Sequence, residues 1–162
     1  MPTATAFQLP NPLPTTLTDW EALLPPAPKA IGNYVLLANH NNLWMTSGTL
    51  PLWEGQVAFT GVLDGDSDTT LAVQAAQVAA LNALSIIKAE FGSLSAIQQV
   101  LNVTGYVASA PDFTNQPVVL NGASDFLVAI LGDRGKHTRT AVGVSALPKN
   151  ATVELALTFT IS

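Results

Sequence analysis

Arg139 and Glu154 are the two residues of this sequence whose type and position point most directly to chemistry. Each lies within a run of residues typical of a β-strand, in a chain of which only 10% of the residues are charged. Soluble domains contain about 25% charged residues, and a charge within a strand usually has a partner or a ligand. We therefore expect Arg139 and Glu154 either to form a structural salt bridge or to bind a small charged molecule.

Other residues carry weaker chemical signals. His137 could assist proton transfer, although a partly exposed histidine at a strand edge is the simpler interpretation. Residues 64–68 begin like a calcium-binding loop, but the run lacks the required glycine and glutamate further on, and we interpret it as a turn with acidic residues at a helix N-terminus. Trp44 and Trp53 could form a ligand platform, but packing in the core or at an interface is the simpler use.

Length and composition limit the class of protein. The chain has 162 residues, 48% of them hydrophobic, which is enough for one domain with a full hydrophobic core. The net charge is −5 and there is no basic run, so we expect no nucleic-acid partner, because such binding depends on neutralising phosphates. Two histidines and no cysteine leave little from which to build a zinc or iron site, and we expect no metal.

The sequence also indicates where the protein resides. The N-terminal residues lack the basic and apolar regions of a signal peptide. The longest charge-free segment with helical character, residues 69–87, is interrupted by Gln74, Gln77, Asn82 and Ser85, which argues against a membrane span. We therefore expect a cytoplasmic protein with no membrane partner.

The chain divides into an N-terminal arm, residues 1–28, and a domain formed by residues 29–162. Seven of the eleven prolines fall within the arm, which predicts an extended and irregular segment. The exception is a short helix ending at Pro25, for which Thr18 and Glu21 have the spacing of a capping box.

The domain is predicted to contain strands and helices in the order β-β-β-α-β-α-β-β, an α+β sheet with its helices on one face. The turn-rich residues 39–42 predict a hairpin between the first two strands. We expect strands at Tyr34–Ala38, Leu43–Ser47, Gln56–Leu63, Val100–Ala108, Thr138–Ala146 and Thr152–Ile161, and helices at Thr69–Phe91 and Val118–Leu131.

Two features of these elements bear on function. The first predicted helix has only a narrow polar stripe, which indicates burial on more than one side. In the last two strands, side chains alternate between faces, and we expect the large apolar residues to lie under the helices. Arg139 and Glu154 would then both project from the helix-free face of a terminal hairpin, although a tight turn would place residue 158, and not Glu154, opposite Arg139.

Several motifs, taken together and in this order, resemble the RidA (YjgF-like) family. The similarity covers residues 28–162, and the proline-rich lead-in resembles the longer branch of the family that is often called "endoribonuclease L-PSP". The matching segments are Ala30-Ile-Gly-Asn-Tyr34-Val, Ser47-Gly-Thr-Leu-Pro51, Pro111-Asp-Phe113, Asn121-Gly-Ala-Ser-Asp, and Thr138-Arg-Thr-Ala-Val-Gly-Val followed by Leu147-Pro148 and Val153-Glu154.

The resemblance implies a chorismate-mutase-like fold and a homotrimer in which three sheets form a barrel, with ligand clefts between subunits. It also implies an imine deaminase that hydrolyses 2-imino acids, such as 2-iminopropanoate and 2-iminobutanoate, to 2-oxo acids and ammonia. No metal or organic cofactor is needed for this chemistry, because a protonated imine is already electrophilic and requires mainly positioning and a placed water.

The resemblance further assigns roles to individual residues. Arg139 would clamp the substrate carboxylate and Glu154 would orient the attacking water. The cleft would be lined by Tyr34, the backbone around Gly48, Asn121 and the backbone of Ala141, a position at which the family often has cysteine.

Two further functions are compatible with the same residues. A non-catalytic homotrimer that binds small carboxylates needs Arg139 but not Glu154. A ribonuclease, the activity in the family's name, fits poorly because the chain is acidic and lacks a His–Lys constellation.

Overall fold

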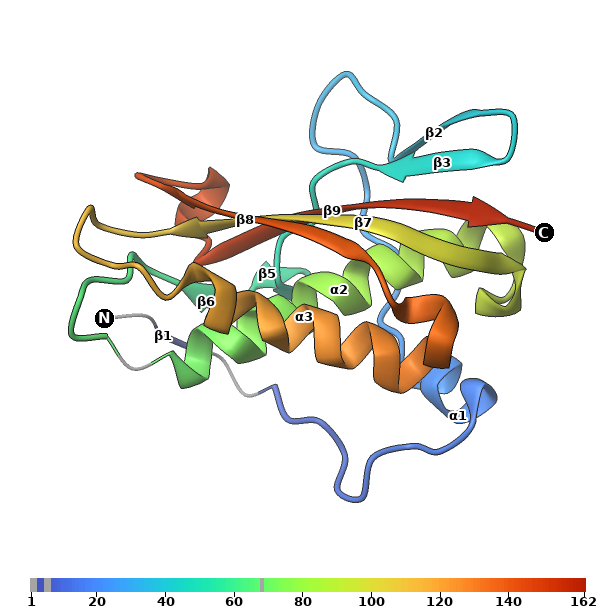
Figure 1. Cartoon of the computed structure of the whole chain (residues 1–162), viewed down its shortest axis with the longest axis horizontal. Helices are drawn as coiled ribbons and strands as arrows, with labels where there is room; N and C mark the ends of the chain where they lie inside the picture. The colour runs from blue at the N-terminus through green and yellow to red at the C-terminus, as the bar shows by residue number, and fades with distance from the viewer. Residues whose placement is uncertain (1–2, 5–6, 68) are drawn as a thin grey trace.

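The computed structural model describes residues 3–4, 7–67 and 69–162; parts of the predicted arm and Asp68 of the acidic turn therefore lie outside the described residues. Five strands form one mixed sheet, in the order β2-β3-β9-β7-β8, and two long helices cover one of its faces (Figure 1). The α+β architecture with helices on one face is thus confirmed. The sheet strands are β2 (Leu37–His40), β3 (Leu43–Thr46), β7 (Ile97–Ala108), β8 (Thr138–Val144) and β9 (Val153–Ile161), and the helices are α2 (Thr70–Phe91) and α3 (Gln116–Leu131).

The predicted hairpin is confirmed, but the predicted third strand is not part of the sheet. β2 and β3 pair antiparallel across a turn at Asn41, which has a positive φ of 55°. Residues 56–63 instead form two short strands that pair outside the main sheet. These minor pairs are β4 (Leu52–Trp53) with β5 (Gln56–Val57), and β1 (Thr3–Ala4) with β6 (Phe59–Thr60).

β8 and β9 are not the hairpin that the sequence suggested. β7 lies between them, parallel to β8 and antiparallel to β9, so that β7, α3 and β8 form a β-α-β unit. Arg139 pairs with Val103 of β7, and Glu154 pairs with Tyr106. The predicted register between the last two strands was therefore wrong, because the long β7 strand takes the central position.

The face from which Arg139 projects was also predicted wrongly. In β9, Leu155, Leu157 and Phe159 are buried under the helices, and Glu154 lies on the helix-free face as expected. Paired residues of parallel strands share a face, and Val103 is buried under the helices, so Arg139 points toward α3. β8 is an edge strand, and its helix-facing side carries polar and small residues instead of large apolar ones.

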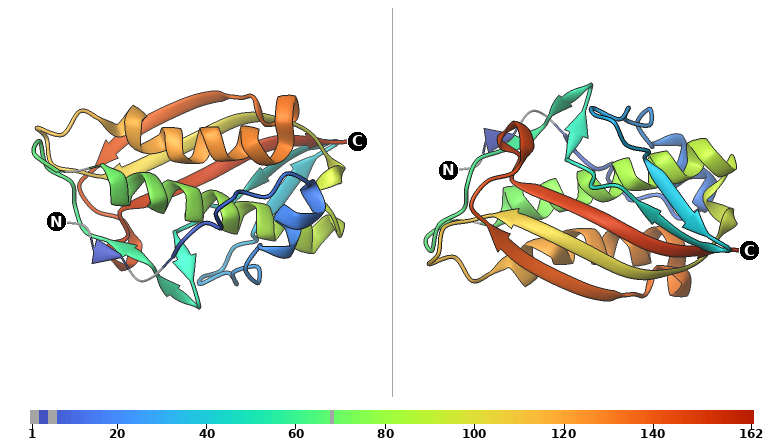
Figure 2. Two further views of the ribbon diagram at one scale, coloured as in Figure 1. Left: turned by 90° about the horizontal axis from the view of Figure 1, so that it is seen from below. Right: turned by 90° about the horizontal axis from the view of Figure 1, so that it is seen from above.

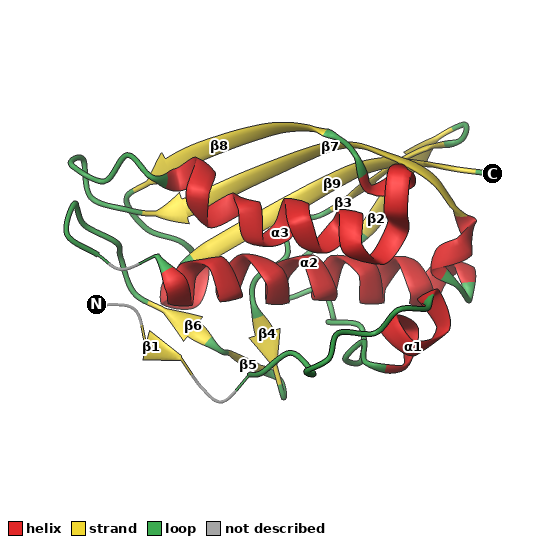
Figure 3. Ribbon diagram, turned by 60° about the horizontal axis from the view of Figure 1, so that its bottom comes forward, coloured by secondary structure: helices red, strands yellow, loops and turns green. Residues whose placement is uncertain are grey.

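Burial of α2 on more than one side is confirmed, and it is achieved within one chain. α2 lies between α3 on one side and the arm with β1, β4, β5 and β6 on the other (Figure 3). The two helices approach so closely that a Cβ on Gly122 of α3 would overlap the carbonyl oxygen of Val73. By length and composition α2 could cross a membrane, but 72% of its most apolar stretch is buried inside the molecule.

The helix of the arm, α1 (Leu17–Ala22), begins two residues earlier than the capping-box spacing predicted. Thr16, and not Thr18, caps it by accepting a hydrogen bond from the backbone N–H of Asp19 at 3.2 Å. Glu21 has a long-range role instead. Its carboxylate accepts hydrogen bonds of 2.7 Å from the Ser93 hydroxyl and from the backbone N–H of Leu94, which ties the arm to the end of α2.

The opposite face of the sheet carries no helix (Figure 2, right). By register, the residues on this helix-free face include Met45, Thr158, Glu154, Tyr106 and Val142, which come from four neighbouring strands. Met45, Tyr106 and Val142 are exposed. The face is therefore a mixture of threonines and apolar side chains, and it is open to solvent in a single chain.

Candidate functional site

Tyr34, Gly48 and Glu154 lie together at one cavity of about 390 Å³, which we call the Glu154 cavity. The segment between the arm and β2 forms one wall, the residues after β3 form another, and the start of β9 supplies Glu154. Apolar side chains make up most of the lining, including Leu36, Leu50, Leu52 and Ile86. Three of the six predicted site residues are thus brought to one place.

Gly48 is held directly against Glu154. Its neighbour Thr49 pairs with Leu155 through two backbone hydrogen bonds of 2.7 and 3.1 Å, and Ser47 donates its hydroxyl to the carbonyl of Val35 at 2.6 Å. A Cβ at position 48 would overlap Oε1 of Glu154 and would lie 2.9 Å from its Cδ. Only glycine leaves room for the carboxylate in this position.

The Glu154 carboxylate is half-buried, and this raises the pKa of the carboxyl group above its usual value of 4.5, because burial disfavours the charged form. Among the described residues none donates a hydrogen bond to it or forms an ion pair with it. A carboxylate of this kind is available to accept a proton from a ligand or a water molecule.

Two lysines and a tyrosine also line the Glu154 cavity. Lys149 lies in a tight turn, Pro148–Asn150, with a positive φ of 55°, and Lys29 belongs to the segment that precedes β2. The Tyr34 hydroxyl accepts a hydrogen bond of 3.3 Å from the backbone N–H of Ile31. The position of Lys149 was not predicted; the only available signal was its place in a turn shortly before Glu154.

Arg139 lies in a second group of polar residues, between β8 and α3, which we call the Arg139 cluster: Asn121, Ser124, His137 and Arg139. Nη1 of Arg139 donates to Oδ1 of Asn121 at 2.9 Å and to Oγ of Ser124 at 3.0 Å, while Nη2 donates to the carbonyl of Pro117 at 3.2 Å. Asn121, which was expected only to line the cleft, therefore contacts Arg139 directly.

Ser124 was not predicted as a site residue, and His137 was predicted only as a partly exposed histidine at a strand edge. Ser124 follows Asn121 by three residues, so both lie on one face of α3, which was the available signal. His137 is half-buried, with Nε2 2.9 Å from Oγ of Ser124 and Nδ1 2.6 Å from the carbonyl of Gly135. The ring is partly exposed beside the edge strand β8, as expected, and both of its nitrogens have a hydrogen-bond partner.

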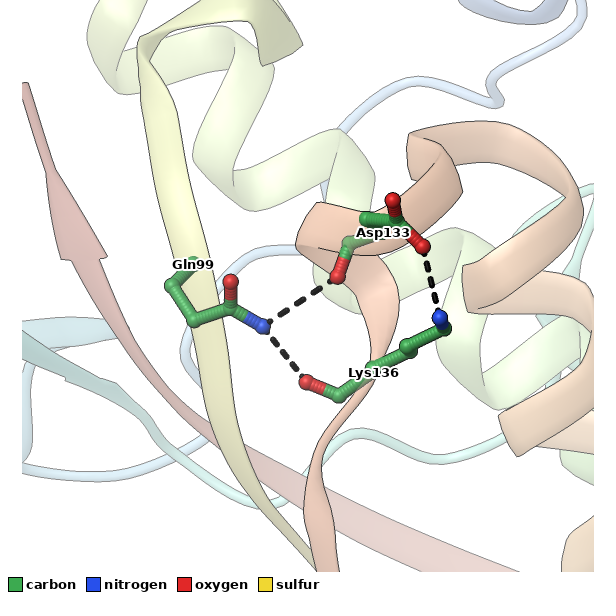
Figure 4. Close-up of polar contacts among 3 residues, drawn as sticks. All are labelled: Gln99, Asp133 and Lys136. Atoms are coloured by element: carbon green, nitrogen blue, oxygen red, sulfur yellow. Dashed lines mark hydrogen bonds and ion pairs between the residues drawn. The ribbon is translucent and has the colours of Figure 1, made fainter.

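The segment that leads into His137 is fixed from several sides. The Gln99 side chain donates to the carbonyls of Lys136 and Asp133 at 2.6 and 3.4 Å, and Lys136 forms an ion pair of 2.6 Å with Asp133 (Figure 4). Arg134 donates to the carbonyl of Ile97 at 2.7 Å. These contacts hold the start of β8, and with it the Arg139 cluster, in a defined position.

The Glu154 cavity and the Arg139 cluster do not meet within one chain. Glu154 projects from the helix-free face of β9, whereas Arg139 projects from the helix-covered face of β8, with β7 between the two strands. Ala141 shares the face of Arg139 and is partly buried against the core. Trp44 and Trp53 pack edge-to-face on Phe91 and Phe7, with ring centroids 4.9 and 5.0 Å apart, which confirms the packing interpretation.

Comparison with known proteins identifies the class of protein that this fold and these residues define. Residues 17–160 match the family described as "YjgF/chorismate mutase-like, putative endoribonuclease". The chain belongs to this family and has its chorismate-mutase-like fold.

Individual relatives cover most of the chain. Protein TCP17 of Trypanosoma cruzi is 36% identical over 133 residues, which are 82% of this chain and 83% of that protein. The crystal structure of Atu1372 from Agrobacterium tumefaciens, a protein of unknown function, is 40% identical over 90% of both chains, with a TM-score of 0.82. A Shewanella oneidensis protein with the same endoribonuclease description is 29% identical over 90% of this chain and 99% of its own, with a TM-score of 0.85.

Proposed function

We propose that the protein is an imine deaminase that hydrolyses 2-imino acids to 2-oxo acids and ammonia. 2-Iminopropanoate and 2-iminobutanoate are the substrates that the family resemblance suggests. The reaction would take place in clefts between the subunits of a homotrimer, where the Arg139 cluster of one subunit faces the Glu154 cavity of the next.

The observation that carries this proposal is that the Arg139 guanidinium uses only part of its hydrogen-bonding capacity within the chain. Three protein acceptors use both N–H groups of Nη1 and one of Nη2. Within the described residues, Nε and the second N–H of Nη2 have no acceptor. Nε and Nη2 form one edge of a guanidinium, and such an edge binds a carboxylate in bidentate fashion.

Glu154 supplies the second part of the chemistry. Burial raises the pKa of this carboxyl group toward neutral pH. A general base is most effective when its pKa lies near the pH at which the reaction runs. A water molecule gives a proton to this carboxylate as its oxygen attacks the carbon of the protonated imine, which forms a tetrahedral carbon bearing OH and NH2. Glu154 then returns the proton to the nitrogen, the C–N bond breaks to release ammonia, and the hydroxyl gives its proton back to the carboxylate as the carbonyl of the 2-oxo acid forms. Tyr34 and Gly48 border the space in which the imine carbon would lie.

The location of the two groups supports a site shared by two subunits. Arg139 and Glu154 project from opposite faces of the sheet, so a single chain cannot place both against one small substrate. The helix-free face leaves Met45, Tyr106 and Val142 exposed, which is typical of a surface that another protein covers. Burial of α2 does not contribute to this argument, because the chain itself accounts for it.

Two alternatives have different requirements. A non-catalytic trimer that binds small carboxylates would use Arg139 and leave Glu154 without a role. RNA binding is less well supported, because six basic residues in a chain of net charge −5 can neutralise few phosphates. We therefore expect no salt-dependent RNA affinity in a filter-binding titration.

We also propose a cytoplasmic location for the protein.

The proposed activity is tested by competition with semicarbazide. An amino-acid oxidase generates 2-iminopropanoate from alanine, and semicarbazide traps the free imine. Active protein is expected to lower semicarbazone formation, whereas Arg139→Ala is expected to lose this effect, because a bidentate charge-assisted contact contributes about 2–4 kcal/mol. If the wild-type protein does not compete with the trap but still binds 2-oxobutanoate through Arg139, the protein is the carboxylate-binding module.

A further inference from the structure

Ser124 and His137 form a chain of hydrogen bonds that ends at Arg139. The chain runs from the carbonyl of Gly135 to Nδ1 of His137, from Nε2 of His137 to Oγ of Ser124, and from Oγ of Ser124 to Nη1 of Arg139. The three separations are 2.6, 2.9 and 3.0 Å. Neither Ser124 nor His137 has a role in the family resemblance or in the proposed reaction.

The direction of each hydrogen bond follows from its neighbours. The Gly135 carbonyl can only accept, so Nδ1 of His137 must carry a hydrogen. In a neutral ring Nε2 is then an acceptor, and Ser124 must donate its hydroxyl hydrogen to it. This leaves the lone pairs of the Ser124 oxygen for the guanidinium of Arg139. A backbone carbonyl thus sets the orientation of a hydroxyl that contacts the proposed carboxylate-binding arginine.

These contacts determine the plane of the guanidinium. The three groups that accept from Arg139 belong to Pro117, Asn121 and Ser124, which are spaced by four and three residues on one face of α3. Asn121 and Ser124 both accept hydrogen bonds from Nη1, and the carbonyl of Pro117 accepts one from Nη2. The two terminal nitrogens are thus fixed against α3, while Nε has no acceptor among the described residues.

The geometry points to Ser124 and His137 as positioning residues for Arg139. They hold the guanidinium in the orientation that presents its free edge to a substrate carboxylate, and they act without touching the substrate. This inference rests on the proposed function of Arg139 as the carboxylate clamp. Loss of the Ser124 hydroxyl should therefore weaken carboxylate binding more than it slows the chemical step.

A nucleophilic role for Ser124 is the competing interpretation, since a serine within 2.9 Å of a histidine is also the arrangement of a nucleophile and its base. The guanidinium of Arg139, however, donates a hydrogen bond to the same oxygen. This positive group draws electron density from the oxygen and makes it a weaker nucleophile. Covalent labelling of Ser124 by diisopropyl fluorophosphate would show a reactive nucleophile and would overturn the positioning role.

The test compares Ser124→Ala, Ser124→Thr, His137→Ala and the control Ser95→Ala at pH 8. Ser95 is exposed, and its side chain makes no hydrogen bond within the described part of the chain. Ser124→Ala is expected to raise the KM for 2-iminobutanoate about tenfold and to change kcat by less than about twofold, because a contact to a charged group is lost from ground state and transition state alike. His137→Ala should raise the KM by a smaller factor. Ser124→Thr, which keeps the hydroxyl, should have a KM close to that of wild type.

The second readout is the affinity for 2-oxobutanoate, measured by calorimetry, which does not depend on turnover. Ser124→Ala is expected to weaken it by about the same factor as it raises the KM. If wild type binds 2-oxobutanoate but hydrolyses no imine, the proposed deaminase activity fails and the positioning role is decided by this affinity alone. Unchanged affinity in Ser124→Ala, or a loss confined to kcat, would overturn the inference.

Discussion

The backbone of Gly48 lies against the carboxylate of Glu154, with no space for even a methyl group between them. A Cβ at position 48 would overlap Oε1 and would lie 2.9 Å from Cδ. Thr49 and Leu155, the next residues in each segment, are joined by two backbone hydrogen bonds, so neither segment can easily move away. The position of the Glu154 carboxylate is therefore set by the absence of a side chain at residue 48.

Gly48→Ala is expected to displace the Glu154 side chain and to lower kcat about 100-fold, because misplacing a catalytic group by about 1 Å has an effect of this size. The fold should persist, with a loss of about 1–3 kcal/mol in the free energy of unfolding. The matched control is Gly65→Ala, whose Cβ would lie 3.0 Å from Oδ2 of Asp112, an exposed carboxylate that can move. Equal activity of the two variants would show that the position of Glu154 does not matter for turnover.

Glu154→Gln is expected to stabilise the protein at neutral pH. Burial raises the pKa of Glu154 above 4.5 in the folded state, so its contribution to stability is present at low pH and is lost as the pH rises through the folded-state pKa. The variant should be more stable than wild type at pH 8 in urea titrations at one protein concentration, and the difference should vanish as the pH falls to about 4. A wild type that is more stable at pH 8 would instead indicate a cationic partner for this carboxylate.

Val142→Glu is expected to dissociate the proposed trimer without unfolding the subunit. Val142 lies on the helix-free face beside Tyr106 and is 38% exposed in a single chain, so a charge there has access to water until another subunit covers it. Val62, which is also 38% exposed but lies in the loop after β6, supplies the control Val62→Glu. Sedimentation equilibrium should give about 16.9 kDa for the first variant and three times this mass for the second. A monomeric wild type would remove the basis for a shared cleft.

The local pattern of the sequence was sufficient to predict most of the fold. The hairpin around Asn41, the long α2 helix and the alternation along β9 all follow from turn residues and hydrophobic periodicity. The order of strands in the sheet could not be predicted in this way, because hydrophobic periodicity does not indicate which strands are neighbours. The insertion of β7 between β8 and β9 decided the face of Arg139, and this is a property of the whole sheet.

The same limit applies to the site. The identities of Arg139 and Glu154 as isolated charges within strands were evident from the sequence, and the motifs around them indicated the family. The hydrogen bonds of Ser124 and His137 were not predictable, because they depend on how α3 packs against β8. The contact of Gly48 with Glu154 likewise depends on a bridge between residues 49 and 155, which are distant in the sequence.

The central claim, that one subunit supplies Arg139 and the next supplies Glu154, is tested most directly by mixing two inactive variants. Arg139→Ala and Glu154→Gln are unfolded together at equal concentration, refolded as mixed trimers and assayed for competition with semicarbazide. Because each shared cleft needs an intact arginine from one variant and an intact glutamate from the other, about one quarter of the clefts should be wild type, with a corresponding recovery of activity. If the mixture shows only the mean activity of its two parents, the residues act within one chain or not at all, and the account is wrong.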